Sequence, residues 1–212
     1  MDATTPARAE RLALSDLFLT VGPDAPTLCE GWDARDLAAH LVVRERRPDI
    51  APGMVVPALA NHSEKVRVTE GERPWPELVE RVRTGPPVWN PMRLRPVEAL
   101  VNTVEYFVHH EDVRRARPGW TPRELSPELT DALAGSLARM GRLLTRSAKV
   151  GLEAHPDGRD PIRLRKGEPT VTVSGPVGEL VLYVYGRKDV AQVGLDGPSD
   201  AVEQVRTASF GF

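Results

Sequence analysis

Apolar positions recur at helical spacing through the first two thirds of the chain and alternate at every second position afterwards. Residues 6–21 carry apolar side chains at relative positions i, i+3, i+4 and i+7, which is typical of an amphipathic helix, and Thr5 is a suitable N-cap. After Ala148 the period changes to 2, as expected for β-strands. The pattern predicts an α+β protein with a helical domain, 1–148, followed by a smaller α+β domain, 149–212.

The helical domain is predicted to contain several helices joined by Pro- and Gly-containing connections. They are expected at residues 6–21, 34–47, 55–69, 76–84, 96–117 and 127–147. Residues 48–95 are the hardest to assign, because proline and glycine recur throughout them. After Pro96, no glycine or proline interrupts the chain until Pro118, so this stretch is predicted to be one long helix.

The second domain is predicted to be a small sheet with two helices. Strands are expected at 150–154, 161–165, 170–174 and 190–195, and helices at 178–185 and 199–206. The residues His155-Pro156-Asp157-Gly158 are expected to form the turn between the first two strands.

Composition narrows the classes of function. The chain has 212 residues, 41% hydrophobic and 27% charged, with a net charge of -2, which does not favour a nucleic-acid partner. The basic clusters Arg44–Arg47 and Arg114–Arg117 lie beside acids and are interpreted as solvated helix faces. No apolar run reaches the roughly 20 residues that a membrane helix needs.

The N-terminus lacks the basic and apolar regions of a signal peptide, and Cys29 is the single cysteine. An intramolecular disulfide is therefore excluded, and the cytoplasm is the expected compartment. A structural role for Cys29 is favoured over a catalytic one, since Gly31-Trp32 follows it closely.

Glu105 and His109 are four residues apart in the predicted long helix, so their side chains lie on one face, one turn apart. A carboxylate and an imidazole in this arrangement can share a metal ion, although the same spacing also occurs in ordinary surface pairs. A third ligand would come from a neighbouring helix. His40 is the best candidate, because it is helical and adjoins the apolar positions Leu37 and Leu41.

The other histidines fit this site less well. His62 lies in a weakly predicted region, and His155 lies in a turn of the second domain. His110 is rotated by about 100° from its neighbour on the helix and is interpreted as structural or pocket-lining. Asp112 is either an acceptor that orients an imidazole or part of the polar helix edge. No HExxH, Gly-rich phosphate loop or G-x-S-x-G element is present in the sequence.

Two motifs together resemble the mycothiol-dependent maleylpyruvate isomerase family within the DinB-like metal-binding superfamily. The first, GWDARDLAAHL at Gly31–Leu41, resembles the family's W-x-x-x-D-L-x-x-H-L helix start. The second, Glu105-x-x-x-His109-x-x-Asp112, resembles its second metal-binding helix. The stretch 173–187 is similar to the family's sterol-carrier-like C-terminal domain.

The resemblance implies a DinB-like four-helix bundle followed by a sterol-carrier-like domain. It also implies that His40, Glu105 and His109 bind Zn²⁺ or another divalent metal, with a water in the open position. A family arginine linked to thiol binding would correspond to Arg187.

Three functions are compatible with these features. The first is a zinc-dependent isomerase or S-transferase that uses mycothiol, a low-molecular-weight thiol, to attack an electrophilic substrate, with selectivity in residues 48–95. The second is a zinc-dependent hydrolase, for which Asp112 or His110 would be the general base. The third is a non-enzymatic metal- or ligand-binding protein.

Overall fold

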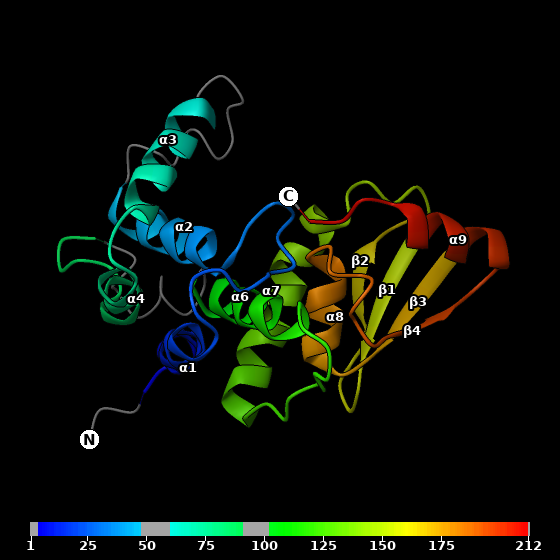
Figure 1. Cartoon of the computed structure of the whole chain (residues 1–212). Coiled ribbons are helices and arrows are strands. Elements are labelled where there is room, and N and C mark those ends of the chain that lie inside the picture. Colours follow the sequence, from blue (N-terminus) through cyan, green and yellow to red (C-terminus); the bar gives the residue numbers. More distant parts are fainter. Residues whose placement is uncertain (1–3, 48–59, 91–101, 212) are drawn as a thin grey trace. The chain divides into compact units, whose positions relative to one another are not determined.

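The computed structural model describes residues 4–47, 60–90 and 102–211 (Figure 1). These residues form an α+β fold with eight helices and one four-stranded sheet. They belong to two compact units, Met1–Pro122 and Arg123–Phe212. No helix within the described ranges is both long enough and apolar enough to span a bilayer.

The first unit is helical. It contains α1 (Pro6–Val21), α2 (Ala34–Arg46), α3 (Ala60–Gly71), α4 (Trp75–Thr84) and α6 (Thr103–Arg115). The predicted start of α1 is confirmed, because Thr5 Oγ1 accepts a hydrogen bond from the Arg8 amide. The start of α2 is fixed by a capping box, in which Asp33 and Asp36 each accept from the other's backbone amide.

The apolar faces of these helices meet in one core. α1 packs against α4 and α6, and α2 packs against α3 and α4. The largest fully buried side chains of this core are Leu14, Phe18, Leu37, Leu41, Leu78 and Tyr106. The core holds α2 and α6 in positions that bring His40 close to Glu105 and His109, which lie in the first two turns of α6.

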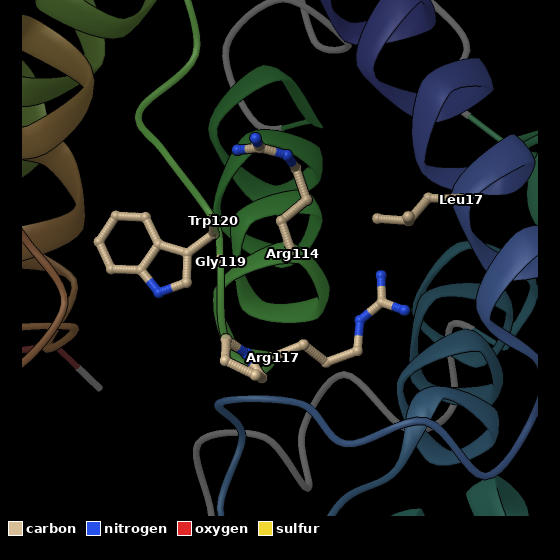
Figure 2. Close-up of a pocket in the computed structure, with 6 residues that line it drawn as sticks. Leu17, Arg114, Arg117, Gly119 and Trp120 are labelled. Atoms are coloured by element: carbon tan, nitrogen blue, oxygen red, sulfur yellow. The ribbon is translucent and has the colours of Figure 1, made fainter.

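A pocket of about 480 Å³ opens beside the C-terminal end of α6 and the turn that follows it (Figure 2). It is lined by Leu17, Arg114, Arg117, Pro118, Gly119 and Trp120. Figure 2 shows the Arg117 side chain extending toward Leu17 of α1. None of the three predicted metal ligands lines this pocket, which is therefore separate from the candidate site.

The second unit contains α7 (Pro127–Leu144), β1 (Gly151–Pro156), β2 (Ile162–Arg165), β3 (Thr170–Gly175), α8 (Val177–Val184), β4 (Gly194–Asp196) and α9 (Ser199–Thr207). The strand order is β2-β1-β3-β4. β1 pairs parallel with β3, and the outer pairs are antiparallel. The alternation in β3 buries Val171 and Val173, as period 2 predicts.

Helix α7, expected in the helical domain, belongs to the second compact unit, Arg123–Phe212. It packs against α8 and β2. Gly141 makes the close approach possible, because a Cβ there would overlap the Leu164 side chain of β2. The helical period of this stretch identifies a buried face of α7 without identifying the elements that cover it.

Most predicted elements are present with small shifts at their ends. The helix predicted at 96–117 ends at Arg115, and that predicted at 127–147 ends at Leu144. The last strand is shorter than expected, because residues 190–193 are not in a strand. Predicted helical residues 55–59 and 96–101 lie outside the described residues.

Candidate metal centre

His40 is placed by the second turn of α2 and by the loop that leads into this helix. The Trp32 ring lies against the His40 ring, with centroids 5.2 Å apart. On the indole, the Arg67 guanidinium of α3 lies 4.8 Å from the ring centroid. The imidazole is therefore packed on one side by an aromatic ring, which restricts its orientation.

Glu105 and His109 lie one turn apart on α6, as the sequence predicted. Glu105 Oε1 is 3.4 Å from His109 Nε2 and 3.3 Å from His40 Nε2. One ligand atom from each of these three residues lies within 4.8 Å of the others. The structure thus brings together all three residues that the sequence selected as metal ligands.

The donor set and its spacing fit a divalent metal such as zinc. With N and O ligands at about 2.0–2.1 Å, a tetrahedral ion separates its ligand atoms by about 3.3 Å. The two distances to Glu105 Oε1, 3.3 and 3.4 Å, match this value. Two imidazoles and one carboxylate leave a fourth position for another ligand, which is the usual composition of a catalytic rather than a structural zinc site.

The surroundings shift the pKa values of the three residues in different directions. Burial alone would raise the pKa of Glu105, but Arg44 and the two imidazoles hold this pKa well below its usual value. Burial, together with the nearby His109 and Arg44, lowers the pKa of His40 although its contact with Glu105 raises it. Burial also opposes protonation of His109, yet hydrogen bonds with Asp112, Cys29 and Glu105 raise its pKa well above the usual value.

Asp112 lies behind His109, as one of the two sequence interpretations proposed. Its Oδ2 is 2.9 Å from His109 Nδ1, and the side chain is completely buried. The contact leaves His109 Nε2 directed at Glu105, on the side of the other ligands. A carboxylate in this place fixes the tautomer and the orientation of a metal-binding imidazole.

Cys29 extends this chain of contacts by one residue. Its Sγ donates to Asp112 Oδ2 over 3.3 Å and lies 3.9 Å from His109 Nδ1. Cys29, His109 and Asp112 also form a geometrically possible metal-binding group. We interpret them as a hydrogen-bonded chain, since 2.9 Å between Nδ1 and Oδ2 is a hydrogen-bond length and shorter than the ligand separation expected around zinc.

The remaining histidines lie elsewhere. His110 is buried, and its Nδ1 contacts Glu10 Oε2 at 2.9 Å, which fits the structural role considered for it. His62 is an exposed residue of α3. His155 belongs to the second unit, where its Nε2 is 3.5 Å from Glu153 Oε2.

Arg187, the residue linked by resemblance to thiol binding, also belongs to the second unit. It follows α8, and its Nη1 donates to the Tyr185 carbonyl over 2.6 Å. A thiol-binding role for Arg187 stays a prediction.

The interpretation of Arg44–Arg47 and Arg114–Arg117 as solvated faces was wrong for particular members of both clusters. The Arg44 side chain is only 7% exposed and contacts Glu105, as the distance of 3.3 Å from its Nε to Oε1 shows. Arg115 is 4% exposed and donates to Glu111 over 2.6 Å. Charged residues are rarely buried without partners. Glu111 lies one helical turn before Arg115, whereas only the tertiary structure could reveal Glu105 as the partner of Arg44.

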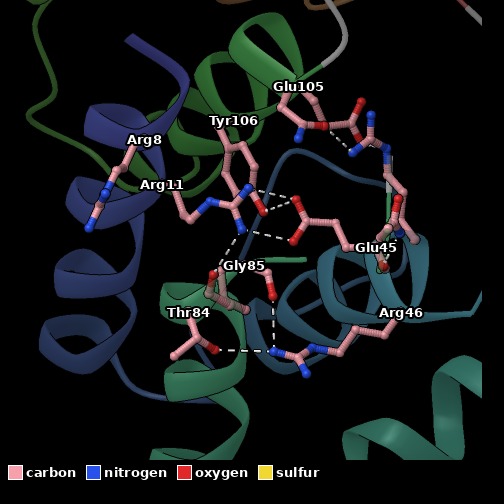
Figure 3. Close-up of polar contacts among 12 residues, drawn as sticks. Arg8, Arg11, Glu45, Arg46, Thr84, Gly85, Glu105 and Tyr106 are labelled. Atoms are coloured by element: carbon pink, nitrogen blue, oxygen red, sulfur yellow. Dashed lines mark hydrogen bonds and ion pairs between the residues drawn. The ribbon is translucent and has the colours of Figure 1, made fainter. Parts of the chain in front are cut away.

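A further charged cluster surrounds Glu45 near the C-terminal end of α2 (Figure 3). Arg11 donates to both oxygens of Glu45 over 2.8 Å, and Tyr106 donates its hydroxyl to Glu45 over 2.9 Å. All three side chains are buried. Sequence reasoning missed this cluster, because its members come from three different helices.

The fold and the site define an α+β protein with a candidate His-Glu-His metal centre between two helices of its helical unit. The fold is similar to that of two crystal structures, those of a mycothiol-dependent maleylpyruvate isomerase and of a histidine-to-alanine mutant of that enzyme. The mutant structure matches with a TM-score of 0.61 and 16% sequence identity, and the other with a TM-score of 0.58 and 17% identity. In both, 90% of each chain is covered.

No protein-family model matches the chain, and no curated protein matches it significantly. At 16% and 17% identity the likeness lies in the fold. The resemblance that the two sequence motifs indicated is confirmed at this level.

Proposed function

We propose that the protein is a metal-dependent enzyme that uses a low-molecular-weight thiol, of the isomerase or S-transferase type. The observation that carries this proposal is the convergence of His40, Glu105 and His109, with ligand atoms within 4.8 Å of one another. The similarity of the fold to a mycothiol-dependent maleylpyruvate isomerase supports mycothiol as the thiol.

In this proposal the three residues hold Zn²⁺ or another divalent metal, and Asp112 orients His109 through its Nδ1. A bound metal lowers the pKa of a thiol ligand and fixes the reactive thiolate in place. The protein does not need a cysteine nucleophile of its own, and the Cys29 thiol is engaged with Asp112.

The finer features of the fold belong to the same proposal. We interpret the helical unit as a DinB-like four-helix bundle and the second unit as a sterol-carrier-like domain. Arg187 of the second unit is proposed to contact the thiol cosubstrate. In an isomerase the thiol adds to a double bond of an electrophilic substrate and leaves after rotation, whereas in a transferase it stays attached.

The hydrolase alternative lacks a general base among the residues considered for it. Asp112 is completely buried, and its Oδ2 already contacts His109 and Cys29. His110 is buried against Glu10. No observation in the described ranges favours the non-enzymatic alternative over the thiol-dependent enzyme.

The test is thiol-dependent turnover, followed as isomerisation of maleylpyruvate and as conjugation of mycothiol to electrophiles. We expect activity in the wild type, with loss after metal removal and in His40→Ala. His155→Ala, which changes a histidine of β1 in the second unit, serves as the control and keeps activity. Turnover that survives both metal removal and His40→Ala contradicts the proposal.

A further inference from the structure

Arg44 lies one turn after His40 on α2, and its guanidinium approaches the candidate site from the same helix face. Its Nε is 3.3 Å from Glu105 Oε1, the oxygen that His40 and His109 also contact. The Arg44 side chain is 7% exposed. A guanidinium with so little solvent around it has few alternative orientations, so its contact with the carboxylate is a fixed part of the site.

Asn102 holds the other end of this guanidinium. Arg44 Nη1 donates to Asn102 Oδ1 over 2.8 Å, and Asn102, directly before α6, is completely buried. Among the described residues, Asn102 Nδ2 has no hydrogen-bond partner. A buried donor without an acceptor lowers stability. The favourable contact of the Asn102 side chain is the hydrogen bond that its carbonyl oxygen accepts from Arg44, and this contact fixes the guanidinium.

We propose that Arg44, anchored by Asn102, positions Glu105 as a metal ligand. Asn102, the N-cap of α6, lies three residues before Glu105, which is within one helical turn. The Arg44 guanidinium, which extends from α2, therefore contacts both Asn102 at the start of α6 and Glu105, the first proposed metal ligand on α6. The rigid planar fork of arginine can contact an amide and a carboxylate at once, and a lysine ammonium lacks this geometry.

The proposal rests on the metal site proposed above. A cation beside the site also repels a divalent metal, which opposes the positioning effect. The two effects separate in Arg44→Lys, since that substitution keeps the charge and loses the fork. They separate again in Arg44→Gln, which removes the repulsion, so that an effect of charge alone would tighten metal binding.

The experiment measures zinc affinity by competition with a chromophoric chelator, together with the thermal unfolding midpoint of the metal-free proteins. Arg44→Lys and Arg44→Gln are each expected to bind zinc about tenfold more weakly than the wild type. The matched control is Arg46→Lys, two residues further on α2. Arg46 donates to the Gly85 carbonyl over 2.9 Å and to Thr84 over 3.1 Å, away from the three ligands (Figure 3).

Wild-type affinity in Arg44→Lys, or tighter binding in Arg44→Gln, would overturn the proposal. If either variant fails to fold, Asn102→Ala tests the same contact while retaining the arginine, and it is expected to weaken zinc binding. Unchanged affinity in Asn102→Ala would then count against positioning. His40→Ala separates the two levels: if that variant retains wild-type zinc affinity, the metal site itself is refuted rather than the role of Arg44.

Discussion

The imidazoles of His40 and His109 lie edge to face, with ring centroids 5.4 Å apart, although they belong to different helices. Each presents its Nε2 to the same oxygen of Glu105. When two imidazoles approach one carboxylate oxygen, the arrangement is electrostatically favourable if a cation lies between the three groups or if one imidazole is protonated. This arrangement leads to predictions about protons, metal and stability.

Metal binding should release about one proton near neutral pH. The raised pKa of His109 means that this ring is protonated in the metal-free protein and must lose its proton to bind. His40, whose pKa is lowered, is already neutral. Isothermal titration calorimetry in buffers of different ionisation enthalpy measures the proton count, and a count near zero would contradict this assignment.

The same shift gives a pH dependence. Zinc affinity is expected to rise by about tenfold per pH unit until the pKa of His109 in the folded protein is passed. The metal-free fold behaves in the opposite way, because a raised histidine pKa contributes stability below the unfolded pKa and loses it as pH rises through the folded pKa. Unfolding titrations of the metal-free protein at several pH values measure this contribution.

Asp112→Asn should weaken zinc binding by about 10–100-fold. The amide preserves the shape of the side chain but removes the negative charge that holds His109 through Nδ1. Competition with a chelator measures the affinity. Cys29→Ser, which keeps a donor for Asp112, is the matched control and should bind zinc much as the wild type does. Equal affinities in all three proteins would exclude the orienting role of Asp112.

Glu45→Ala should destabilise the protein by about 3–5 kcal/mol, because it leaves the buried Arg11 guanidinium without its carboxylate. Glu77→Ala is the control, since Glu77 forms an exposed pair with Arg73 that is expected to contribute less than about 1 kcal/mol. Urea unfolding of both variants measures the difference. Similar losses in the two variants would show that the buried pair has no special weight.

The sequence was informative where a feature depends on neighbouring residues. The spacing of Glu105 and His109 places both on one helix face wherever that helix lies, and the capping residues Asp33 and Asp36 fix the start of the helix that carries His40. The motifs then indicated the family whose fold the structure resembles.

Features that depend on the pairing of distant helices could not be predicted in this way. Arg44 resembles any solvated arginine until α2 is placed beside α6 and Glu105 comes within 3.3 Å. The same holds for α7, whose apolar stripe did not identify the sheet as its partner. Arg187 is a different case, because its proposed role depends on a ligand rather than on the fold.

Zinc stoichiometry under equilibrium dialysis tests the central claim most directly. The wild type is expected to bind one zinc ion per chain, whereas His40→Ala and Glu105→Gln should lose more than about 100-fold in affinity, since each removes a direct ligand. His155→Ala, in the second unit, should bind as the wild type does. A wild type that binds no zinc, or ligand variants that bind it equally well, would contradict a metal centre formed by His40, Glu105 and His109.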